Sequence, residues 1–277
     1  MNVFMSHWSL PKDNDNSELF LDMWKVSCAL AKKHYGKVFL VTDTPGRETL
    51  KILPFDEIIV ALDGIPQIPH MWCAGKLYAY KYAAMYGQFL HLDADVFLWE
   101  KLPEDLTNSD IFAQNIEDDY LLNNVYKKFP GDYEAPSLIN TIIENKMEYL
   151  PYNVGIFGGT NVEQIEKYVD IALDLFEDPQ WYHYFNNESG KSNRFTKSCL
   201  LEQGVLGYCR AKYNWNVECL YEENDKNNKT YLKYTHLVSA KNFPEIKAKI
   251  AERVKTGPYD LTPKKTGLYE WSSRDEE

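Results

Sequence analysis

The sequence has no apolar run long enough to cross a membrane, since a spanning helix needs roughly 18 or more apolar residues in succession. The first residues, Met1 to Trp8, also lack the basic start, the long apolar stretch and the small-residue cleavage site of a secretory signal. The five cysteines are odd in number and widely separated, which is typical of reduced thiols rather than of disulfides or a zinc site. These absences predict a cytoplasmic protein without a transmembrane segment.

Positive charge is also scarce. Lysine and arginine number 30 against 41 aspartates and glutamates, which gives a formal net charge of -11. Proteins that bind nucleic acids or anionic membranes usually present a basic face, so neither kind of partner is expected. A substrate that carries phosphate would therefore depend on a metal ion or on a local group of basic side chains.

What the sequence does contain is an alternation of apolar runs, typical of buried strands, with stretches whose apolar residues recur at helical spacing. Strands are expected at residues 2–5, 37–42, 57–60, 88–92, 110–114, 153–158, 216–220 and 233–238. Helices are expected at residues 18–34, in a stretch ending near 53, and at 75–86, 136–146, 162–176, 198–208 and 244–254. This alternation predicts an α/β fold with a central, mostly parallel sheet flanked by helices. We expect one domain over residues 1–257 and a polar tail at 258–277.

The segment Phe89-Leu90-His91-Leu92-Asp93-Ala94-Asp95-Val96 is the most informative for chemistry. It places Asp93 at the carboxyl end of a buried strand, where ligands bind in open α/β sheets. Asp93 and Asp95 fall on one side of an extended segment, with Ala94 between them. Converging carboxylates repel each other, and Mg²⁺ or Mn²⁺ relieves that repulsion while bridging to substrate phosphates. The alternative is a strand that ends in an ordinary polar turn.

His236 and Lys241 lie near the end of a late expected strand. Imidazole is a common partner of carboxylates at a divalent metal site. A lysine can bind a phosphate oxygen as a point charge. Each residue alone also has an ordinary interpretation, as a hydrogen-bonded structural histidine and a solvated surface lysine. Their pairing favours a role in binding a metal and a phosphate.

Five short motifs, including the surroundings of the Asp-x-Asp, occur in order along the chain. They are Gly75-Lys76-Leu77-Tyr78 ahead of the aspartates, Tyr152-Asn153-Val154-Gly155-Ile156-Phe157, Glu202-Gln203-Gly204-Val205-Leu206, Lys212-Tyr213-Asn214-Trp215-Asn216, and the spacing from His236 to Lys241. This order resembles that of glycogenin and the related bacterial galactosyl- and glucosyltransferases, which are retaining enzymes of the GT-A type. The resemblance covers about residues 76 to 241. The chain departs from it in two segments. Glu202 stands where the family has aspartate, and around Lys241 the chain has Ser239 where glycine is usual and Asn242-Phe243 where the family has Pro-Trp.

The resemblance implies a GT-A (nucleotide-diphospho-sugar transferase) fold and a hexosyltransferase activity. Such an enzyme transfers a hexose from a nucleotide-diphosphate sugar, here a UDP-sugar, to a saccharide or other hydroxyl acceptor with retention. The implied ligands of Mn²⁺ or Mg²⁺ are Asp93, Asp95 and His236. The implied donor-binding residues are Ser6, Trp8, Asp43, Lys76, Ala94, Asn153, Gly155 and Lys241. Glu202 and Gln203 would lie beside the donor sugar, as stabiliser or nucleophile.

Several of these residues have structural alternatives. Trp8 is equally suited to the core, and Asp43 to starting the turn at Pro45-Gly46. Asn153 is equally suited to capping a strand or turn. Glu202 is suited to a helix N-terminus, where the helix dipole favours acidic side chains.

Other classes of protein also fit parts of the pattern. A phosphatase of the haloacid-dehalogenase type carries an Asp-x-Asp after a buried strand, but near the start of its domain and followed by threonine or glycine. A nucleotidyltransferase would need a glycine-rich, basic phosphate loop near residue 10, which the sequence lacks. A non-catalytic protein that binds sugars or nucleotides would keep the fold without the reaction. The presence of Asp93, Asp95 and His236 together favours the enzyme.

Overall fold

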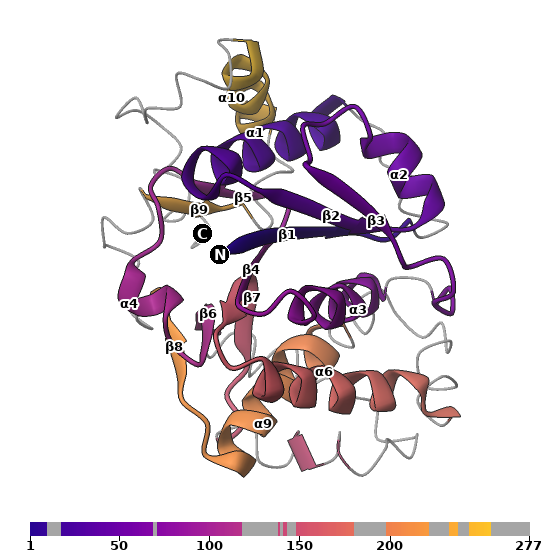
Figure 1. Ribbon diagram of the computed structural model, residues 1–277, viewed down its shortest axis with the longest axis vertical. Coiled ribbons are helices and arrows are strands. Elements are labelled where there is room, and N and C mark those ends of the chain that lie inside the picture. The colour runs from indigo at the N-terminus through magenta and orange to yellow at the C-terminus, as the bar shows by residue number, and fades with distance from the viewer. Residues whose placement is uncertain are drawn as a thin grey trace.

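The computed structural model describes residues 1–9, 18–68, 71–117, 138, 141–142, 148–179, 198–221, 233–237 and 244–255. These residues form an α/β fold around a sheet of seven strands (Figure 1). Helices α1 (Glu18–Tyr35) and α2 (Thr44–Leu50) lie on one side of its parallel strands, and α3 (Trp72–Ala84) lies on the other. None of the helices described combines the length and apolar character that a membrane crossing requires.

The large sheet has the strand order β3-β2-β1-β4-β7-β6-β8. Strands β1 to β4 all run parallel, β7 runs antiparallel to both of its neighbours, and β8 runs parallel to β6. The strands are β1 (Asn2–His7), β2 (Val38–Thr42), β3 (Glu57–Val60), β4 (Phe89–Leu92), β6 (Ile111–Ile116), β7 (Tyr152–Gly159) and β8 (Val217–Cys219). The expected mostly parallel sheet flanked by helices is therefore confirmed.

A second, smaller sheet consists of two antiparallel strands, β5 (Val96–Leu98) and β9 (Tyr234–His236). The pairing joins segments that are far apart in the sequence. It matters for the site, because β5 begins one residue after Asp95 and β9 ends at His236.

Alternating side chains divide the core into two layers. In β1, Phe4 packs on the side of α3, while Val3 and Met5 pack on the side of α1 with Trp24. This follows from the period of two along a strand, which sends successive side chains to opposite faces of the sheet. The remaining helices are α4 (Glu104–Thr107), α6 (Val162–Glu177), a π-helix η3 (Leu200–Gly204), α9 (Val205–Tyr213) and α10 (Pro244–Lys255).

The elements differ from the sequence-based expectation in a few places. Helix α3 begins at Trp72 rather than at residue 75, and β5 was not expected as a strand. The helix expected at residues 198–208 is divided into η3 and α9. Most of the helix expected at residues 136–146, and the whole tail at 258–277, lie outside the described residues.

Candidate metal centre

The two aspartates of the Asp-x-Asp lie in a tight turn between β4 and β5. The backbone N–H of Asp93 donates to the carbonyl of Gly155 on β7 at 2.9 Å, which continues the pairing of β4 one residue beyond the strand. The N–H of Val96 then donates back to the carbonyl of Asp93 at 3.1 Å. These two bonds fix the backbone on both sides of Ala94, so both carboxylates are held at the carboxyl end of a central strand.

The pairing of β5 with β9 brings His236 to this turn. His236 lies opposite Val96 in the register, and the N–H of Leu237 donates to the carbonyl of Asp95 at 3.1 Å. The Nε2 atom of His236 lies 3.4 Å from Oδ1 of Asp95. One ligand atom from each of Asp93, Asp95 and His236 lies within 4.8 Å of the other two. The structure therefore brings together the three side chains singled out from the sequence as metal ligands.

Charge and burial at His236 act in opposite directions. Burial by itself lowers the pKa of the imidazole, but the nearby carboxylates of Asp95 and Asp93 raise it, and the net shift of the pKa is upward. The carboxylates of Asp93 and Asp95 thus favour a positive charge beside them. Two carboxylates and an imidazole nitrogen are a donor set that suits a divalent cation, so the residues fit a metal centre.

Gly155 provides the space in which the imidazole of His236 lies. A Cβ atom on Gly155 would lie 2.4 Å from Cε1 and 2.6 Å from Nδ1 of His236. Such distances are well inside van der Waals contact, so any larger residue would displace the ring. The sequence had suggested Gly155 as a donor-binding residue, whereas its observed contacts are with a candidate metal ligand.

We expect Gly155→Ala to weaken Mn²⁺ binding by moving the His236 imidazole, and to lower the free energy of unfolding by about 1–3 kcal/mol, the usual cost of overpacking. Chemical unfolding and Mn²⁺ titration would measure the two effects. Gly64→Ala is the matched control, because a Cβ on Gly64 meets nothing within 4 Å. Unchanged Mn²⁺ affinity in Gly155→Ala would argue against His236 as a ligand.

Lys76 connects the turn to the interior of the protein. Its Nζ atom lies 2.7 Å from Oδ1 of Asp93 and 2.9 Å from Oε1 of Glu202. The side chains of Lys76 and Glu202 are only 9% and 6% exposed, against 28% for Asp93. Burial lowers the pKa of Lys76, but the two carboxylates outweigh it and the net shift is upward. One protonated lysine therefore balances two carboxylates.

Glu202 and Gln203 lie in the π-helix η3, a form often found at functional sites. The hydroxyl of Tyr168 donates a hydrogen bond to the backbone carbonyl of Glu202 at 2.9 Å. A side chain from outside the π-helix thus provides a partner for one of its carbonyl groups. Burial raises the pKa of Glu202, while Lys76 acts against that rise. The carboxylate of Glu202 points to Lys76 and is absent from the residues that line the neighbouring cleft.

That cleft has a volume of about 400 Å³ and lies beside the aspartates. Its size falls within the usual range for small-molecule sites. The lining residues are Ser6, His7, Trp8, Phe20, Trp24, Trp72, Lys76, Asp93, Ala94 and Asp95. Sequence reasoning missed Trp72, which is 41% exposed. Its spacing of four residues from Lys76 on α3 is the signal that would have placed both on one helix face.

The remaining predicted donor-binding residues have diverse surroundings. Ser6 and Trp8 line the cleft, and the Ser6 hydroxyl hydrogen-bonds Nε2 of the buried His91 at 2.9 Å. Asn153 donates to Oε1 of Glu117 at 2.7 Å and accepts from the N–H of Gly155 at 3.0 Å. Lys241 lies outside the described residues.

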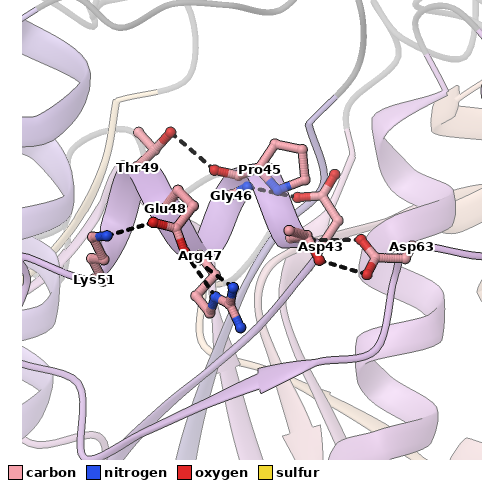
Figure 2. Close-up of polar contacts among 9 residues, drawn as sticks. Asp43, Pro45, Gly46, Arg47, Glu48, Thr49, Lys51 and Asp63 are labelled. Carbon is pink, nitrogen blue, oxygen red and sulfur yellow. Dashed lines mark hydrogen bonds and ion pairs between the residues drawn. The ribbon is translucent and has the colours of Figure 1, made fainter.

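Asp43 acts as the N-cap of α2 (Figure 2). Its Oδ1 accepts from the N–H of Gly46 at 2.9 Å and from the hydroxyl of Ser9 at 3.0 Å. Asp63 accepts from the N–H and the hydroxyl of Thr44 at the same helix end, both at 2.7 Å. Two carboxylates thus occupy the start of α2, and Asp43 is absent from the cleft lining. Asp43 therefore has the structural role of starting the turn into α2.

Together these features define an α/β protein with a candidate acidic metal centre beside a cleft, at the carboxyl end of its parallel strands. Residues 10–255 match the model of a family described as a family of unknown function (DUF6734), and the chain belongs to that family. The search of curated proteins gave no match.

Proposed function

We propose that the protein is a metal-dependent glycosyltransferase whose donor is a nucleotide-diphosphate sugar, such as a UDP-hexose. The observation that carries this proposal is the convergence of Asp93, Asp95 and His236 beside the protonated Lys76, at a cleft of suitable size. A donor diphosphate needs positive charge, which the acidic chain as a whole does not provide. A cation held by Asp93, Asp95 and His236 would supply that charge.

The arrangement of the sheet supports the proposal. One antiparallel strand, β7, lies within an otherwise parallel run, and the Asp-x-Asp directly follows β4 at the centre of the sheet. This order is compatible with a fold of the GT-A type. The order of the five sequence motifs resembles the same class of enzyme.

Each group has a distinct role in the proposed transfer. A divalent cation held by Asp93, Asp95 and His236 would neutralise charge that develops on the leaving diphosphate. Lys76 lines the cleft and keeps its proton, so it can bind a diphosphate oxygen as a fixed charge. The acceptor would be a saccharide or another hydroxyl compound.

Glu202 is better suited to anchoring Lys76 than to attacking the sugar, because its carboxylate is buried and faces Nζ of that lysine. Its neighbour Gln203 has a buried Oε1 that finds no hydrogen-bond partner among the described residues. Gln203, like Glu202, is absent from the residues that line the cleft. We therefore assign the support of Lys76 to Glu202, and the contact of Gln203 with the donor sugar stays a prediction.

The test is a panel of nucleotide sugars incubated with the protein, with Mn²⁺ or with a chelator. We expect at least one UDP-hexose to release UDP, with the release abolished by EDTA and restored by added Mn²⁺. Binding of the same UDP-hexose with equal affinity in EDTA would contradict the proposal. Mn²⁺-dependent binding without any turnover or transfer would indicate a non-catalytic relative. Hydrolysis of a simple phosphomonoester that is lost in Asp93→Asn would indicate a phosphatase.

A further inference from the structure

Gln114, on β6, contacts the side of His236 that faces away from the aspartates. Its Oε1 lies 2.8 Å from Nδ1 of His236, while Nε2 of the same ring lies 3.4 Å from Oδ1 of Asp95. Gln114 is itself buried, at 5% exposure. The imidazole is therefore held between an amide oxygen and a carboxylate.

A chain of hydrogen bonds fixes which end of the Gln114 amide faces the ring. The backbone carbonyl of Ile116 can only accept, so the side-chain nitrogen of Asn115 donates to it, at 2.8 Å. Oδ1 of Asn115 is thus left to accept from Nε2 of Gln114, at 3.0 Å. This bond turns Oε1 of Gln114 towards His236. Because an amide oxygen cannot donate, the proton of the bond must be on Nδ1 of the histidine.

An irregularity in the sheet allows this contact. In the pairing of β6 with β7, Ala113 lies opposite Phe157, but Asn115 lies opposite Asn153. Gln114 therefore faces three residues of β7 where a regular pair would face one, and such bulges re-aim side chains next to functional sites. Gly155 lies in the same stretch, and its missing side chain leaves room for both the imidazole and Oε1 of Gln114.

We propose that Gln114 is a positioning residue of the metal centre, which fixes the tautomer of His236 with its proton on Nδ1 and directs the lone pair of Nε2 to the cation. The inference rests on the metal site of the proposed function. A histidine ligand commonly donates its other ring N–H to a neighbouring acceptor, which sets both the tautomer and the ring orientation. Here that acceptor is a neutral amide, so the second contact adds no further negative charge to an acidic site.

The test compares Mn²⁺ binding by the wild type and two variants at Gln114. Gln114→Met keeps a side chain of similar length but removes the acceptor, so we expect its Kd for Mn²⁺ to rise by about 10- to 100-fold. Gln114→Glu keeps an acceptor oxygen for Nδ1 but loses the donation to Oδ1 of Asn115, and we expect its Kd to stay below that of Gln114→Met. Electron paramagnetic resonance of free Mn²⁺ gives the Kd, and pulsed measurements of the bound ion detect coupling to the ¹⁴N of a coordinated imidazole. That coupling should be present in the wild type and in Gln114→Glu, and weakened in Gln114→Met.

Gln88→Met is the control for a general loss of stability. Gln88 precedes β4 at the end opposite the aspartates, and its amide donates one hydrogen bond, to the carbonyl of Thr107 at 2.7 Å. We expect this variant to bind Mn²⁺ as the wild type does. Equal Kd and equal ¹⁴N coupling in Gln114→Met and the wild type would overturn the role of Gln114 while leaving the metal site intact. Absence of Mn²⁺ binding by the wild type would instead refute the metal site of the proposed function, and the inference with it.

Discussion

Lys76→Met is expected to lower the free energy of unfolding at pH 7 by about 3–5 kcal/mol, the usual cost of removing one partner from a buried ion pair. The reason is the burial of Glu202, whose carboxylate would lose the cation 2.9 Å away. Asp93 would lose the same partner, but its greater exposure lets water compensate in part. Urea unfolding followed by circular dichroism would measure the change.

The pH dependence of this variant separates charge from packing. Burial already raises the pKa of Glu202, and the loss of Lys76 raises it further above its unfolded value. A carboxyl group whose pKa is higher in the folded than in the unfolded state contributes to the stability of the protein. This contribution is fully present below the unfolded pKa and is lost as the pH rises through the folded pKa. The deficit of Lys76→Met against the wild type should therefore be small in acid and grow as the pH rises from about 4 towards 7.

Two controls sharpen the test. The double variant Lys76→Met/Glu202→Gln removes the uncompensated charge and should recover most of the lost stability. Lys81→Met makes the same change on the same helix, at an exposed pair with Asp170, and should cost less than about 1 kcal/mol. If Lys76→Met costs no more than Lys81→Met, Lys76 does not balance a buried charge.

Asp95→Ala is expected to reduce Mn²⁺-dependent turnover of the UDP-hexose by at least about 100-fold, because a catalytic metal contributes several kcal/mol and each 1.4 kcal/mol corresponds to a factor of ten. Asp95 is buried and lies beside both of the other candidate ligands, so no other side chain in the turn replaces it. Asp174→Ala, at an exposed position of α6, is the control for loss of one negative charge.

Thermal unfolding with and without Mn²⁺ would show whether the loss in Asp95→Ala arises from metal binding. A ligand present at 100 times its Kd stabilises the folded protein by about 2.7 kcal/mol. We expect Mn²⁺ to raise the unfolding temperature of the wild type and of Asp174→Ala through this stabilisation. We expect no such rise in Asp95→Ala. Full turnover by Asp95→Ala would remove the Asp-x-Asp from the proposed mechanism.

The larger elements of the fold could be predicted because each leaves a strong local pattern. The five residues of β2 are all buried, and the first four, Val38 to Val41, form a continuous apolar run. The helix α6 has apolar residues on one face, and its prediction at residues 162–176 falls one residue short of its end. Strand β5 was missed because three residues give too little pattern, and its partner β9 lies far away in the sequence. The reversed direction of β7 likewise depends on pairing rather than on its own composition.

The residues of the candidate site that could be predicted are those whose side chains commonly bind metals. Asp93, Asp95 and His236 carry groups that bind metals, and the sequence motifs place them in order. Gln114 was missed because a single glutamine in an apolar strand has no distinctive spacing, and its role depends on the irregular pairing of β6 with β7. The contact of Gly155 with the histidine was missed for the same reason, since only the folded backbone shows how closely the ring approaches.

The two-stranded sheet also sets the order in which the centre can assemble as the chain is synthesised. All seven strands of the larger sheet are made by Cys219, whereas His236 follows on β9. Chains leave the ribosome from the N-terminus at about 5–20 residues per second, so the aspartate turn emerges well before its histidine. Lys76 precedes the aspartates and can neutralise Asp93 during that interval. The acidic turn thus has its lysine partner available before the chain reaches His236, the candidate metal ligand that is synthesised last.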